Sequence, residues 1–121
     1  MISILLVDDH ATLRRAVRKL LERSGEVEVV GEVDDGQQAL QAIDKLAPDI
    51  VVLDVLMPKL DGFGVLKALQ KMPRRPKVLM LSMDDTIDAR QRALAHGASA
   101  YVPKQFTHQQ LLPAVKAVAA G

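Results

Sequence analysis

Residues 50–54 read IVVLD, four consecutive apolar residues followed directly by an aspartate. An apolar run of this length without alternating polar residues is typical of a strand covered on both faces, as in a parallel sheet between two layers of helices. Working outward from this run, four more segments of strand length are predicted: residues 4–7, 27–30, 78–81 and 98–102. The sequence therefore indicates a five-stranded parallel sheet.

Helical periods lie between these segments. Apolar residues at i, i+3 and i+4 spacing predict helices over residues 13–21, 39–47 and 66–72. A fourth helix is predicted over residues 85–96. Its apolar stripe is thin, with Ile87 and Leu94 among small alanines, and thin packing indicates a movable helix.

A final helix is predicted to end near Val118. Thr107 and Gln110 have the spacing of a capping box at its start. Pro113 fits a helix interior poorly because it lacks an N–H group, so we expect the helix to begin a residue or two after Thr107.

Strand and helix alternate five times with short connections, which predicts one α/β domain over residues 1–121. We expect a three-layer sandwich around a flavodoxin-like, doubly wound five-stranded parallel sheet with strand order 2-1-3-4-5. The fifth strand is then an edge strand. An edge tolerates Pro103, which cannot donate to a sheet ladder.

The composition is that of an ordinary globular protein, 49% hydrophobic and 26% charged, rather than a disordered one. The formal net charge of +1 provides no overall field that would recruit nucleic acid or an acidic membrane. The absence of cysteine excludes disulfides, thiolate metal sites and cysteine nucleophiles. No segment has the roughly 18 consecutive apolar residues of a membrane span. We expect a cytoplasmic protein that makes no membrane contact.

Polar residues collect where the predicted strands end. They are Asp8 and Asp9 after the first strand, Asp54 after the third, Ser82 after the fourth and Lys104 after the fifth. Ligands of open parallel sheets bind beyond the carboxyl ends of the strands, near the point where strand order reverses. The sequence thus predicts one site containing three carboxylates, a hydroxyl and an ammonium group.

Three carboxylates this close repel one another, by about 4 kcal/mol per pair at 4 Å and an effective dielectric constant of 20. Lys104 can supply one compensating charge, and a cation the rest. The donors are hard oxygens, which favours Mg²⁺ over zinc. Beside a Lewis acid and a lysine, Asp54 has the surroundings of a carboxylate nucleophile that attacks phosphorus, with Ser82 donating to a phosphoryl oxygen.

These residues resemble the signature of response-regulator receiver domains along the whole chain. The matching pieces are Asp8-Asp9, residues 54–62 (DVLMPKLDG), Ser82, and residues 97–104 (GASAYVPK). The resemblance implies that Asp54 is phosphorylated, that Asp8, Asp9, Asp54 and the main-chain carbonyl of Leu56 bind Mg²⁺, that Lys104 pairs with the phosphoryl group, and that Ser82 and Tyr101 form a switch pair.

The resemblance also implies a phosphoacceptor signalling domain rather than an enzyme. Its partner is expected to be a sensor histidine kinase of a two-component system, with a homodimer on phosphorylation and DNA contact only through a separate output domain. The Asp-Asp-His opening, and a lysine followed by Gln105 where many receivers have proline, resemble the NarL/FixJ class of transcription regulators. Lys59 stands where a glycine is common. The chain is either complete or a fragment of a longer regulator.

Two other functions remain as alternatives. An aspartyl-phosphate hydrolase of the haloacid dehalogenase type would have a second aspartate two residues after its nucleophile, where this chain has Leu56. A flavin-binding module would have a Ser-, Thr- or Gly-rich loop after the first strand, where this chain has Asp8 and Asp9.

Each site residue also has a purely structural interpretation. Asp8 and Asp9 could form a turn, Ser82 could cap the next helix, and Tyr101 could be an ordinary strand aromatic. His10 is expected only to open the first helix. The basic residues of that helix are expected to form a solvated face, with a partner-docking surface as the alternative: Arg14, Arg15, Arg18, Lys19 and Arg23.

Overall fold

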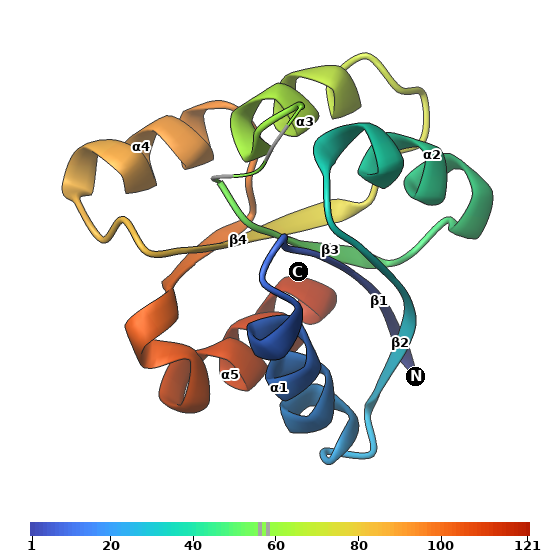
Figure 1. Ribbon diagram of the computed structural model, residues 1–121, viewed down its shortest axis with the longest axis vertical. Helices are drawn as coiled ribbons and strands as arrows, with labels where there is room; N and C mark the ends of the chain where they lie inside the picture. Colours follow the sequence, from blue (N-terminus) through green and yellow to red (C-terminus); the bar gives the residue numbers. More distant parts are fainter. Residues whose placement is uncertain (56, 58) are drawn as a thin grey trace.

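The computed structural model describes residues 1–55, 57 and 59–121. Its five strands form one parallel sheet with the order β2-β1-β3-β4-β5 (Figure 1). The strands are β1 (Ile2–Val7), β2 (Val27–Val33), β3 (Ile50–Leu53), β4 (Lys77–Ser82) and β5 (Ala100–Pro103). The predicted strand order is confirmed, and Pro103 ends an edge strand as expected.

Helices cover both faces of the sheet, which confirms the three-layer sandwich. The helix α1 (Ala11–Glu22) and the C-terminal α5 (Thr107–Ala120) lie on one face. The other face carries α2 (Gly36–Leu46), α3 (Gly62–Leu69) and α4 (Ile87–Ala95) (Figure 1). A short 3-10 helix, η1 (Lys104–Phe106), connects β5 to α5.

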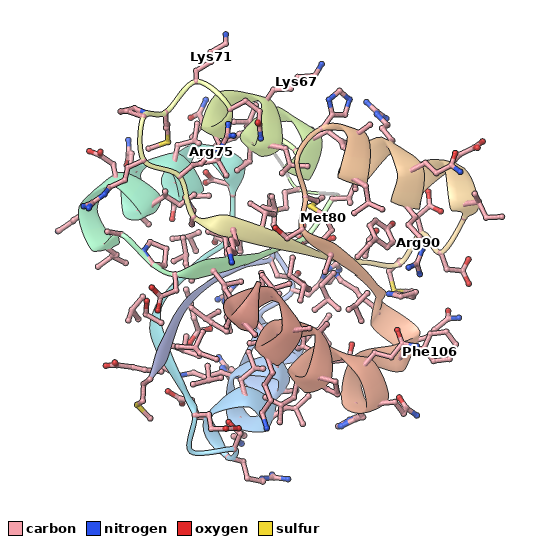
Figure 2. All side chains as sticks on the ribbon, turned by 180° about the vertical axis from the view of Figure 1, so that it is seen from behind. Lys67, Lys71, Arg75, Met80, Arg90 and Phe106 are labelled. Carbon is pink, nitrogen blue, oxygen red and sulfur yellow. The ribbon has the colours of Figure 1, made fainter. Side chains whose placement is uncertain are left out.

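Alternate side chains of the central strands enter two separate cores, because successive residues of a strand point to opposite faces. Val51 and Leu53 pack with the α2, α3 and α4 layer, and Ile50 and Val52 with α1 and α5. All four are at least 97% buried. Figure 2 shows Met80 of β4 in the interior. Burial on both faces explains the unbroken apolar runs in the sequence.

Helix α4 corrects one expectation about packing. Ile87 and Leu94 were expected to form its apolar stripe, but they are 71% and 47% exposed. The helix begins after Thr86, whose hydroxyl caps it, and packs through buried Ala93 and partly buried Ala89. Small residues allow the helix to lie close to the sheet, which leaves the large side chains on the outer side.

The start of α5 corrects another expectation. The prediction of a capping box at Thr107 is wrong, because η1 continues directly into α5 and Thr107 lies in the first turn of the helix. The Thr107 hydroxyl donates to the carbonyl of Lys104 at 2.6 Å, and the capping position, Phe106, makes no side-chain cap. The helix does not start later to avoid Pro113, which lies in its interior.

Candidate functional site

The carboxyl ends of β1 and β3 are neighbours at the centre of the sheet. Helix α1 follows β1 on one face, and α3 follows β3 on the other. Asp8 follows β1 and Asp54 follows β3. The main-chain N–H of Asp54 donates to the carbonyl of Val7 at 2.9 Å, so the two strand ends remain paired at the site. Ser82 ends β4, and Lys104 begins η1 after the edge strand.

Lys104 joins the two buried carboxylates. Its ammonium lies 3.1 Å from Asp8 Oδ2 and 3.2 Å from Asp54 Oδ2. All three side chains are at least 91% buried. The ammonium predicted to lie among the carboxylates is therefore found there, although Gln105 follows the lysine where many receivers have proline.

Asp9 and His10 complete the acidic cluster. Candidate ligand atoms of Asp8, Asp9, His10 and Asp54 all lie within 4.8 Å of one another. The His10 Nδ1 atom is 3.2 Å from both Asp8 Oδ1 and Asp9 Oδ1, and the His10 main-chain N–H donates to Asp8 Oδ1 at 2.8 Å. Asp9 is the most accessible carboxylate, with 35% of its side chain exposed. His10 precedes α1 as expected, but the contacts of its ring with Asp8 and Asp9 were not predicted from the sequence.

Ser82 and Tyr101 hold the same residue at the start of the β4–α4 connection. The buried Ser82 hydroxyl accepts from the Asp84 N–H at 3.2 Å, and the Tyr101 hydroxyl donates to the Asp84 carbonyl. The Tyr101 ring is buried, with the Arg90 guanidinium 5.6 Å from its centroid. Burial raises the pKa of the Tyr101 phenol, although a hydrogen bond with Ser82 opposes the shift.

The segment after β3 approaches the site closely. Asp61 caps α3 by accepting from the Gly64 N–H at 2.8 Å. A side chain at Gly62 would have its Cβ 2.4 Å from the carbonyl oxygen of Asp54, so this position needs glycine. Leu56, the predicted carbonyl ligand, lies outside the described residues.

Lys59 has a backbone φ of +67°, a conformation that favours glycine. This conformation accounts for the expectation of glycine at its position. Its ammonium lies 3.5 Å from Asp35 Oδ2. Asp35 also caps α2 by accepting from the Gln38 N–H, and this hydrogen bond is the main reason that the pKa of Asp35 is lowered.

Arg14 corrects the interpretation of α1 as carrying a solvated basic face. Its side chain is only 17% exposed, and its guanidinium donates to the main-chain carbonyl of Asp8. It also pairs with Glu32 on β2 at 2.8 Å. Arg15, in contrast, is exposed as expected. A partner from β2, 18 residues away, could not be identified from helical periodicity.

The oxygen donors fit a hard divalent cation. Asp8, Asp9 and Asp54 supply three carboxylates within reach of one another, and the sequence contains no cysteine thiolate. Such a set matches the preference of Mg²⁺ for carboxylate oxygens and water. Within the described residues, no helix is long and apolar enough to cross a membrane.

The chain is similar to known proteins along nearly its whole length. Residues 4–116 match the model of the response regulator receiver domain. A protein named as a transcriptional regulator of Pseudomonas aeruginosa is 42% identical over 121 residues, 100% of this chain and 58% of that protein. The nitrate/nitrite response regulator NarL of Escherichia coli K12 is 33% identical over 119 residues, 98% of this chain and 55% of that protein.

The virulence-factor transcription regulator BvgA of Bordetella pertussis is 40% identical over 119 residues, 98% of this chain and 56% of that protein. The chain thus spans little more than half the length of these curated relatives. Among solved structures, the receiver domain of a response regulator named NarL from Mycobacterium tuberculosis superposes with a TM-score of 0.93 at 36% identity. That match covers 99% of this chain and 97% of the solved one.

Proposed function

The chain belongs to the response regulator receiver domain family, and from this premise we propose that it is a switch that accepts one phosphoryl group on Asp54. One observation carries the assignment. The Asp54 carboxylate is buried, lies 3.2 Å from the Lys104 ammonium, and shares the end of the sheet with Asp8 and Asp9. No feature of the site favours a haloacid dehalogenase-type hydrolase.

The transfer needs a phosphohistidine donor, which we assign to a sensor histidine kinase. An Asp54 carboxylate oxygen attacks the phosphorus, the P–N bond breaks, and the imidazole nitrogen leaves with the bonding electron pair. Lys104 then neutralises charge on the phosphoryl group. The buried Ser82 hydroxyl, which accepts from the Asp84 N–H and hydrogen-bonds Tyr101, would redirect its one hydrogen to a phosphoryl oxygen.

Asp8, Asp9 and Asp54 would hold Mg²⁺, with the Leu56 carbonyl proposed as a further ligand. When bound, the cation supplies positive charge to the oxygens of the transferred group. A carboxylate has two oxygens, and Lys104 contacts Oδ2 of both Asp8 and Asp54. The chain's own lysine and a cation can therefore act on the same pair of carboxylates.

The output is also a proposal. Ser82 and Tyr101 hold Asp84 from two sides, so a movement of the Ser82 hydroxyl toward a phosphoryl group and away from the Asp84 N–H would release one restraint on the connection before α4. We assign residues 1–121 to a single cytoplasmic receiver domain. This chain spans 58% and 56% of two relatives that are named as transcription regulators, and the rest of their sequence is available to contact DNA. We also propose that the phosphorylated domain forms a homodimer.

Intact-mass measurement after treatment with a small phosphodonor tests the assignment. The wild-type protein should gain one phosphoryl group only when Mg²⁺ is present, and Asp54→Asn should gain none. Asp44→Asn is the matched control, because Asp44 is an exposed carboxylate on α2. Equal labelling of wild type and Asp54→Asn would refute Asp54 as the acceptor.

A further inference from the structure

We propose that Arg14, oriented by Glu32, is a positioning residue that holds the Asp8–Asp9 turn in the geometry that binds the divalent cation. The inference rests on the proposed function and extends it to two residues outside the acidic cluster. Arg14 would act through the main chain of Asp8 and would not itself contact the phosphoryl group.

The first step of the argument is the main chain of Asp8. Its N–H donates to the carbonyl of Val33 at 3.1 Å, and its carbonyl accepts from Arg14 Nη1. Both main-chain polar groups of Asp8 are therefore bonded, one to β2 and one to α1. The turn that follows has fewer restraints, since Asp9 contacts only the His10 ring among the side-chain contacts described for it. Arg14 thus fixes the residue from which Asp9 projects.

The second step is the orientation of Arg14. Its Nε lies 2.8 Å from Glu32 Oε1, while Glu32 Oε2 lies 2.7 Å from Arg18 Nη1. Each oxygen of the carboxylate therefore has its own arginine. Glu32 is only 21% exposed and is aligned with Leu6 in the adjacent strand β1, so the sheet register determines where this carboxylate lies.

The third step is electrostatic. Arg14 lines the same small cavity as Asp8 and Asp54. An unpaired guanidinium there would compete with a cation for these carboxylates. Glu32 compensates the charge of Arg14 and directs its donors to a neutral carbonyl, which leaves the aspartate oxygens to the cation.

The planar guanidinium of arginine is needed because one side chain must donate to two acceptors, the Glu32 carboxylate and the Asp8 carbonyl. Arg14 uses Nε for Glu32 and Nη1 for Asp8. A lysine is a compact point charge without this planar spacing of donors. It could satisfy the carboxylate or the carbonyl, and would leave the other without its partner.

Calorimetric titration with Mg²⁺ alone, on the unphosphorylated protein, tests the proposal. We expect Arg14→Ala to weaken Mg²⁺ binding about tenfold, the lower end of the effect seen when residues that orient metal ligands are removed. Arg14→Lys and Glu32→Gln should also bind more weakly than wild type. Arg15→Ala is the matched control, because it removes an exposed arginine from the same helix and should bind like wild type.

Melting temperatures without Mg²⁺ separate positioning from a purely structural role. A structural role would lower the melting temperature of Arg14→Ala and leave the Mg²⁺ affinity of the folded fraction unchanged, which would overturn the proposal. Full affinity in both Arg14→Lys and Glu32→Gln would overturn it as well, even if Arg14→Ala did not fold. Failure of the wild-type protein to bind Mg²⁺ would instead refute the proposed function itself.

Discussion

The ammonium of Lys104 lies 3.2 Å from the carboxylate of Asp54, although fifty residues separate the two in the sequence. Parallel strands explain this contact. Both residues follow strands that run in the same direction, so both emerge at the same edge of the sheet. Because Lys104 also contacts Asp8, one cation compensates two buried carboxylates in the absence of metal.

Replacement of Lys104 by methionine should therefore destabilise the metal-free protein by about 3 kcal/mol, because it leaves buried carboxylates without their partner. Added Mg²⁺ should recover part of the loss, since it replaces the missing positive charge. Denaturant unfolding of wild type and Lys104→Met, each with and without Mg²⁺, measures both effects. A variant as stable as wild type in the absence of Mg²⁺ would contradict the prediction.

Asp9 should matter for metal binding and little for metal-free stability. Its carboxylate is the most accessible of the three and has no lysine partner among the described contacts. Asp9→Asn is expected to remove most of the rise in melting temperature that Mg²⁺ produces, because a cation stabilises only the state that binds it. Thermal unfolding over a range of Mg²⁺ concentrations checks this, with Asp44→Asn as the control. An unchanged Mg²⁺ response would exclude Asp9 as a ligand.

Tyr101 offers a direct spectroscopic test, because the sequence contains one tyrosine and no tryptophan. Burial raises the pKa of its phenol above the ordinary value of 10.0. The contribution to stability should be complete below pH 10.0 and should be lost as the pH rises through the folded-state pKa. Ultraviolet titration of the phenolate should give a higher midpoint for the folded protein than for the protein in denaturant. Coincident midpoints would show that the ring is solvated.

Glu32 should contribute to the way in which the free energy of unfolding changes at acidic pH. Hydrogen bonds from Arg18 and Arg14 lower its pKa below the ordinary 4.5, although burial opposes them. A group whose folded-state pKa is lowered stabilises the protein above its unfolded pKa, and this contribution disappears as the pH falls through the folded value. The stability difference between wild type and Glu32→Gln should therefore shrink below pH 4.5. A difference independent of pH in this range would argue against a charged pair.

Much of the candidate site could be predicted because it depends on where strands end. Asp8, Asp54, Ser82 and Lys104 each follow or end an apolar run, and a parallel sheet brings such positions to one edge. The contacts of Arg14 and His10 could not be predicted in this way. They depend on the distance between α1 and β2 and on the geometry of a turn, and neither leaves a periodic pattern in the sequence.

Hydrophobic patterning by itself determined the number and direction of the strands, the two helical layers and the edge that carries the acidic residues. It could do so because burial on both faces requires continuous apolar strands, whatever the details of packing. Only the tertiary structure decided that Ile87 and Leu94 face outward, that the Thr107 hydroxyl donates to the Lys104 carbonyl, and that Arg14 donates to the Asp8 carbonyl. Those outcomes depend on how closely neighbouring elements approach, which single-chain periodicity does not encode.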